Sequence, residues 1–89
     1  MKTNYIIIYN NIIKMQLFIR TYTNKTITIE CNNISSIMEI KEIITSKIII
    51  PSKYYYLTSK GKILHNNNLL SHYDITNNMT LYMHIRHTL

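Results

Sequence analysis

Residues 15–31 alternate between hydrophobic and polar side chains, with one interruption near residues 23–25. A period of two places one set of side chains on one face of a strand, and two such segments joined by a short turn form a β-hairpin. Asn24 lies in the turn, where a residue that tolerates a positive φ is needed. The buried face of this hairpin is predicted to hold Met15, Leu17, Ile19, Ile27, Ile29 and Cys31.

The next segment changes to the period of a helix, with isoleucines three or four residues apart. Ser36 and Glu39 have the spacing of a capping box, in which each side chain binds the other's backbone N–H at a helix start. Pro51 closes the segment, because the residue before a proline disfavours helix. We therefore predict a helix over residues 37–48, whose apolar stripe consists of Ile37, Ile40, Ile43 and Ile44.

Three shorter segments complete the pattern. Residues 54–59 are typical of a strand, the only glycine, Gly61, marks a tight turn, and residues 63–70 are expected to hold a short strand and an Asn-rich loop. Residues 80–86 form the last strand, with Tyr82, His84 and Arg86 facing outward. The order predicts a single α+β domain with one helix packed on a mixed sheet.

These residues resemble the ubiquitin family. The stretches MQLFIRTYTNKTITIE, IKEIITSK, GKIL, LLSHYDI and TLYMHIR follow the family without a gap over residues 15–89. The resemblance implies a β-grasp fold, ββαββ(3-10)β, in which the Tyr73 hydroxyl ties a loop to backbone. Ile49 replaces a family glycine at the helix end, where a left-handed conformation would be strained, so we expect a remodelled turn there.

Residues 1–14 lack a counterpart in the family. Met15 occupies the family's initiator position, so the extension is interpreted either as an artefact of start-site choice or as a β-prone arm that pairs with a sheet edge. The predicted ubiquitin-like domain covers residues 15–89.

The resemblance also implies three partner-binding surfaces. The main family patch is apolar and falls here on Tyr22, Thr58, Tyr82 and His84. A second surface falls on Gln16, Phe18 and Thr26, and a third on Ile50 and Ile85, with His87 as its neighbour. Because an unpaired hydroxyl or imidazole costs about 1–3 kcal/mol to bury, Thr58 and His84 are expected to weaken binding to ordinary ubiquitin readers.

Lysines at the family's chain-linkage positions are Lys25, Lys41, Lys47 and Lys62. The favoured alternative is that they are ordinary surface lysines. Arg86 falls where the family presents an arginine to its activating enzyme, whereas Leu89 falls at the first of two terminal glycines. We therefore expect the reactive C-terminal Gly-Gly to be missing.

Composition narrows the function classes. The four carboxylates and four histidines lack catalytic or metal-ligand spacing, so we expect no enzyme, metal or cofactor. The apolar run near the start is too short to span a membrane and carries no targeting signature. The lone Cys31 fits a reducing cytoplasm or nucleus. Abundant Ile, Asn, Lys and Tyr indicate an AT-rich coding sequence.

We interpret the chain as a ubiquitin-like protein that binds other proteins non-covalently. The alternatives are a covalent modifier, if the sequence continues past Leu89, and a basic nucleic-acid-binding module. The net charge of +6 and the lysine–tyrosine stretch SKYYYLTSKGK favour the last, but the lysines are scattered, and we rank it lowest. A decayed gene product is a further alternative.

Overall fold

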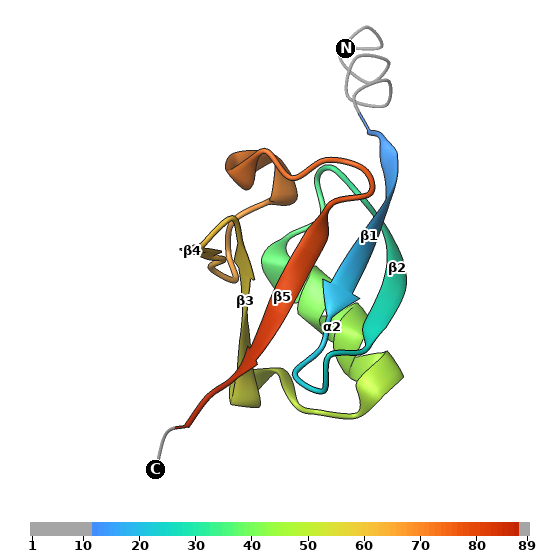
Figure 1. Cartoon of the computed structure of the whole chain (residues 1–89). Coiled ribbons are helices and arrows are strands. Elements are labelled where there is room, and N and C mark those ends of the chain that lie inside the picture. Colours follow the sequence, from blue (N-terminus) through green and yellow to red (C-terminus); the bar gives the residue numbers. More distant parts are fainter. Residues whose placement is uncertain (1–11, 88–89) are drawn as a thin grey trace, which may run out of the picture.

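The computed structural model describes residues 12–87 (Figure 1). Their regular elements are the strands β1 (Lys14–Arg20), β2 (Thr26–Asn32), β3 (Tyr55–Ser59), β4 (Lys62–Ile63) and β5 (Thr80–Ile85), the helix α2 (Ile37–Ile48), and the 3-10 turns η1 (Ser52–Tyr54) and η2 (Leu70–Tyr73). Neither α2 nor any other helix in this range is long and apolar enough to cross a membrane.

The strands form one mixed sheet in the order β2-β1-β5-β3-β4, and α2 crosses one face of it (Figure 1). The central pair, β1 and β5, is parallel, and the outer pairs are antiparallel. Hairpins at each side and the helix between them give the predicted β-grasp arrangement, with η2 as the 3-10 turn before the last strand. The fold prediction is therefore confirmed.

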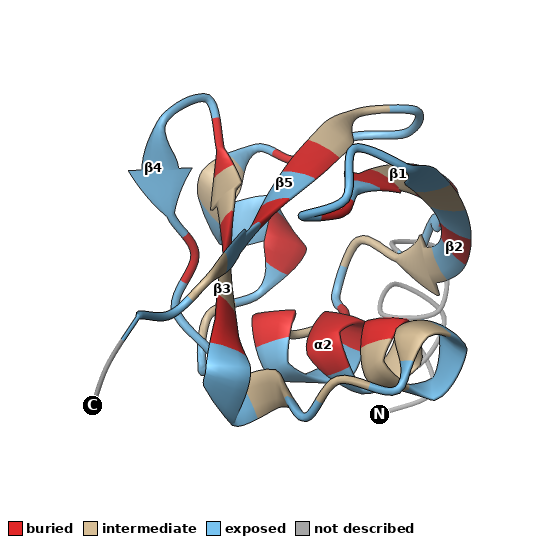
Figure 2. Ribbon diagram, turned by 60° about the horizontal axis from the view of Figure 1, so that its bottom comes forward, coloured by how far each residue is buried: buried red, intermediate tan, exposed pale blue. Residues whose placement is uncertain are grey.

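The hydrophobic core fills the space between the sheet and α2 (Figure 2). Burial of its aliphatic side chains supplies the main stabilisation of a domain this small. Tyr55 is fully buried, and its hydroxyl donates to the Lys41 carbonyl oxygen at 2.9 Å, so its one polar group is satisfied. The other core residues are Met15, Leu17, Ile19, Ile29, Ile37, Ile40, Ile44, Leu57, Leu64, Leu70, Ile75, Leu81 and Met83.

The local signals in the first half of the chain are confirmed. Asn24 adopts φ +66° in the hairpin turn. At the start of α2, the Ser36 hydroxyl accepts from the Glu39 N–H at 3.1 Å, and the Glu39 carboxylate accepts from the Ser36 N–H at 2.8 Å. The helix bounds, Ile37–Ile48, agree with the prediction.

Ile49 ends the helix in the left-handed region, at φ +59° and ψ +38°, and its N–H donates to the Thr45 carbonyl oxygen. The expected remodelling of this turn is therefore wrong, and the isoleucine adopts the conformation that suits glycine. Its side chain is 86% exposed and offers little packing energy in return.

Replacing Ile49 with glycine is expected to stabilise the domain by about 1 kcal/mol, because the penalty of a β-branched side chain in the left-handed region is removed. Urea unfolding followed by circular dichroism measures the change. Met38→Gly, an exposed position inside α2, is the control and should destabilise by about 1 kcal/mol. Equal destabilisation by both glycines would contradict the interpretation.

The second half of the chain departs from the prediction in two details. Tyr54 belongs to η1 rather than to the strand, which begins at Tyr55, and β4 has only two residues, Lys62–Ile63. Lys60 and Gly61 both have positive φ in the tight turn between β3 and β4. The Tyr73 hydroxyl accepts from the His65 N–H at 2.9 Å, which confirms its predicted role of tying the loop to backbone.

Residues 1–11 of the predicted N-terminal extension lie outside the described residues. Its last residue, Lys14, is the first residue of β1. Ile13, just before β1, is bonded to the turn after β2: its N–H donates to Asn33 Oδ1 at 2.7 Å and its carbonyl oxygen accepts from the Asn33 N–H at 3.1 Å. Strand pairing therefore begins before residue 15.

Candidate functional site

One face of the sheet is covered by α2 (Figure 2). The outward side chains of the five strands lie on the opposite face. We call it the outer face. The strand register shows which residues are neighbours on the outer face, since residues paired across strands point to the same side. Along one row, Arg20 is paired with both Thr26 and Tyr82, and Thr58 with both Tyr82 and Ile63. The remaining members are Gln16, Phe18, Thr28, Glu30, Tyr56, Thr80 and His84.

A cluster centred on Tyr56 occupies the β3–β5 part of this face. The Tyr56 and His84 rings stack with centroids 4.9 Å apart and an interplanar angle of 18°. His84 Nε2 and Thr58 Oγ1 form a hydrogen bond of 2.9 Å. The Arg86 guanidinium lies over the Tyr56 ring, 5.5 Å from its centroid, in a cation–π contact. The four side chains therefore hold one another in place.

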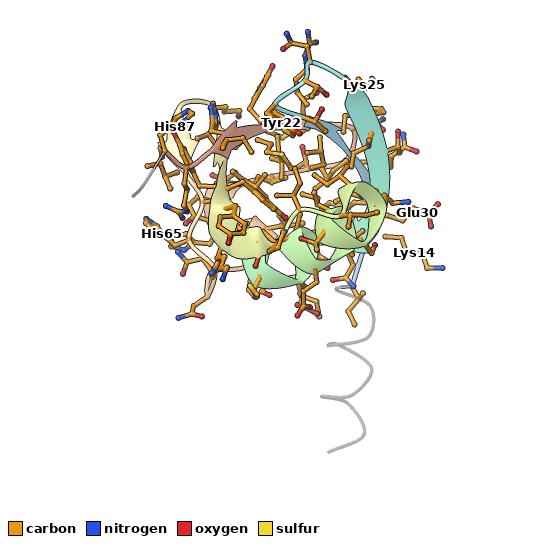
Figure 3. The ribbon with its side chains drawn as sticks, turned by 90° about the horizontal axis from the view of Figure 1, so that it is seen from below. Lys14, Tyr22, Lys25, Glu30, His65 and His87 are labelled. Atoms are coloured by element: carbon orange, nitrogen blue, oxygen red, sulfur yellow. The ribbon has the colours of Figure 1, made fainter. Side chains whose placement is uncertain are left out.

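An open groove of about 550 Å³, which we call the aromatic groove, runs beside this cluster to the β1–β2 turn. Tyr22, in that turn, is 53% exposed, and Tyr82 is 46% exposed. Tyr22 and His87 lie toward the same side of the molecule, with α2 on the other (Figure 3). The groove is lined by Arg20, Thr21, Tyr22, Asn24, Tyr56, Tyr82, Met83, His84, Ile85 and His87.

The structure thus brings together the four residues of the predicted main patch, Tyr22, Thr58, Tyr82 and His84, on or beside the outer face. It also changes the argument about their polarity. Thr58 and His84 satisfy each other, so neither is the unpaired group on which the sequence argument depended.

The second predicted surface is continuous with the first on the outer face. Phe18 is half-buried between Thr28 on β2 and Thr80 on β5. Gln16 is already engaged, because its Nε2 donates to Asn78 Oδ1 at 3.1 Å and its N–H to Asn77 Oδ1 at 2.8 Å. Phe18 and the exposed Thr26 are therefore the members of this surface that remain to contact a partner.

The third predicted surface lies at the end of β5 and near the helix end. Ile50 and Ile85 are both half-buried and pack against the core. Ile50, with Ile27 and Ile48, lines a small hollow of about 150 Å³ beside Tyr22. Ile85 lines the aromatic groove, and Tyr22, which lines both the hollow and the groove, connects the two.

Three of the four linkage-position lysines, Lys25, Lys47 and Lys62, are exposed. Lys41 is only 3% exposed, so its interpretation as an ordinary surface lysine is wrong. Its Nζ donates to Asn66 Oδ1 at 2.6 Å. Burial, and secondarily the charge of Arg86, lowers the pKa of Lys41 below its ordinary 10.5.

Catalytic chemistry finds little support among residues 12–87. Burial raises the pKa of the Cys31 thiol from 9.0 to about 11, which keeps it protonated and weakly nucleophilic at neutral pH. Within the same range no three His, Cys, Asp or Glu side chains gather as metal ligands would.

The family model described as the ubiquitin family matches residues 17–88, most of the chain. The chain belongs to the ubiquitin family. Ubiquitin-like domains generally act as protein modifiers or protein-binding modules rather than as enzymes, and the fold suggests protein partners.

Two residues of this ubiquitin-like domain's aromatic groove were missed from the sequence. Tyr56 was hidden in a run of three tyrosines, although it lies two residues before Thr58 and so shares its face. Arg20 carries no local signal of a binding role, but it pairs with Tyr82 and lines the groove.

Proposed function

We propose that this ubiquitin-like domain is a non-covalent protein-binding module that recognises its partner through the aromatic groove and the adjoining outer face. The observation that carries the proposal is the Tyr56 cluster, in which the half-buried Tyr56 and Thr58 and the exposed His84 and Arg86 fix one another. Side chains that are ordered before binding lose less conformational entropy when a partner arrives.

The composition of the groove supports the proposal. Tyrosine and arginine are the residues that carry most binding energy at protein interfaces. Here Tyr22 and Tyr82 stand about half exposed beside the ordered cluster. The apolar centre of the family patch is replaced by Thr58 and His84, so the partner is expected to differ from ordinary ubiquitin readers.

Covalent attachment is the competing function. The proposal rests on the surface and not on the residues after His87. We further propose that the chain has no catalytic activity and acts in the cytoplasm or nucleus. The free Cys31, the single cysteine of the chain, supports this location.

Site-specific photo-crosslinking tests the proposal. Benzoylphenylalanine is placed at position 82 in the groove or, as a control, at Met38, an exposed residue of α2 on the opposite side. In extracts of cells that express the chain, we expect a discrete light-dependent adduct from position 82 and none from position 38.

Two results would contradict the proposal. Adducts of equal yield from both positions would show that the groove is not a specific site. Adducts that form in the dark, require ATP and survive reduction would identify a covalent modifier instead.

A further inference from the structure

The four acidic residues of the chain all lie away from the aromatic groove. Glu39 and Glu42 are on α2, and Asp74 follows η2. Glu30 is on the outer face but is paired with Gln16, four residues along β1 from Arg20. Arg20 lines the groove, and Arg86 lies at its margin, over the ring of the lining residue Tyr56. Among the side chains of residues 12–87, the charge at the groove is therefore positive and is not offset by a carboxylate of the groove lining.

The register of the strands sets the separation of the two arginines. Arg20 is paired with Tyr82, and Arg86 continues the β5 direction, since its N–H donates to the Tyr54 carbonyl oxygen at 2.8 Å. Four residues along β5 at about 3.3 Å each give a displacement of about 13 Å, and one strand spacing gives about 4.8 Å at right angles to it. The two backbones are therefore about 14 Å apart. Tyr82 and the Tyr56–His84 stack lie between them.

We propose that the aromatic groove binds an acidic protein segment that carries two carboxylates, one for Arg20 and one for Arg86, whose backbones lie about 14 Å apart across a floor of tyrosine and histidine rings. This inference rests on the proposed function and names the chemistry of its partner. A guanidinium pairs with a carboxylate through two parallel hydrogen bonds, which a planar Arg side chain supplies without rearrangement.

An acidic protein segment fits these residues better than a nucleic acid does. Sequence-tolerant binding of single strands needs open aromatic faces on which bases stack. The Tyr56 ring is already contacted by the His84 ring and the Arg86 guanidinium, which leaves Tyr22 and Tyr82, each about half exposed, as the tyrosines of the groove available for stacking. A nucleic acid carries a phosphate at every nucleotide and requires a track of cations, whereas here Arg20 lines the groove and Arg86 lies about 14 Å away at its margin.

Fluorescence anisotropy with the full chain tests this inference. The probe is a labelled twelve-residue peptide with glutamates at positions 4 and 8, which are about 13 Å apart when extended. The control probe replaces both glutamates with glutamine, and a labelled twelve-nucleotide oligouridine tests the nucleic-acid alternative. The protein variants are Arg20→Glu and Arg86→Glu, with Lys47→Glu on the exposed end of α2 as the matched charge reversal.

We expect the acidic peptide to bind at least tenfold more tightly than the glutamine peptide. Each arginine reversal should weaken that binding at least tenfold, whereas Lys47→Glu should change it less than twofold. Circular dichroism confirms that the variants are folded.

Three results would overturn the inference. They are the absence of binding by the acidic peptide, an equal loss with Lys47→Glu, and tighter binding of oligouridine than of the acidic peptide at the same salt concentration. If photo-crosslinking at position 82 succeeds while the acidic peptide fails to bind, only this inference is lost. If crosslinking also fails, the proposed function is lost with it.

Discussion

Replacing Thr58 with isoleucine and His84 with valine together is expected to raise the affinity for a ubiquitin-associated helical domain at least tenfold. In the native chain the two side chains bond to each other at 2.9 Å, and the second ring nitrogen of His84 must give up water when an apolar helix covers it. The double replacement removes both polar groups and adds aliphatic surface, worth about 2 kcal/mol, which corresponds to more than tenfold in affinity.

The single variants separate this explanation from a simple increase in hydrophobicity. Thr58→Ile alone leaves His84 Nε2 without its partner, and His84→Val alone leaves the Thr58 hydroxyl without its partner. Each single change should therefore gain less than half of the combined effect, a coupling typical of residues in direct contact. Calorimetric titration measures all four proteins. Micromolar binding by the native chain, or additive single effects, would contradict the account.

Replacing Asn66 with aspartate is expected to stabilise the fold by about 1–2 kcal/mol. The ammonium of the buried residue Lys41 donates at 2.6 Å to the neutral amide oxygen of the exposed Asn66, and a carboxylate in the same place would supply an opposite charge to this part-buried contact. Urea unfolding at pH 7 measures the change. Asn67→Asp, at the exposed neighbouring position, is the control and should alter stability by less than about 0.5 kcal/mol. Equal effects of the two aspartates would contradict this role of Lys41.

The pH dependence provides a second readout of the same contact. Because burial lowers the pKa of Lys41 in the folded state, the folded chain binds fewer protons than the unfolded chain between that lowered pKa and 10.5. In this window the contribution of Lys41 to the free energy of unfolding increases with pH, and below it the full penalty of burying the charge is present. An aspartate at position 66 raises the lowered pKa and should remove this increase.

Cys31 and Tyr55 contribute with the opposite sign in the same alkaline range. Burial raises the pKa of both groups, so their stabilisation is lost as pH rises through the raised values. Both groups are present in the native chain and in the Asn66→Asp variant. The difference between the two stability curves therefore isolates Lys41.

The first hairpin and α2 were predictable because the residues of each carry several local signals that agree with one another. Alternation fixes the buried face of the hairpin, Asn24 supplies the positive φ of its turn, and Ser36 with Glu39 marks the helix start. The β4 strand was harder, because a two-residue strand has no period to detect.

At Lys41 the helical spacing correctly indicated burial, but the residue type indicated exposure. It lies four residues after Ile37 and three before Ile44, the spacing of the buried stripe. Its charge argued for the surface, and only the fold reveals Asn66 as the partner that makes burial tolerable, from a loop distant in sequence.

The aromatic groove depended on pairing between strands, which no local pattern contains. The contact of His84 with Thr58 and Tyr56 joins residues 26 and 28 positions apart. The family resemblance gave the location of the patch, but the paired hydroxyl and imidazole became visible only through the β3–β5 register. The chemistry of the site therefore had to come from the structure.

Amide chemical-shift mapping of the 15N-labelled full chain, titrated with the partner that crosslinks at position 82, tests the central claim most directly. The account predicts that the largest shift changes cluster at Tyr22, Tyr56, Tyr82 and His84, that they saturate without ATP, and that dilution reverses them. Changes centred on α2 or on the exposed edge of β2 would contradict the assignment of the aromatic groove as the binding site.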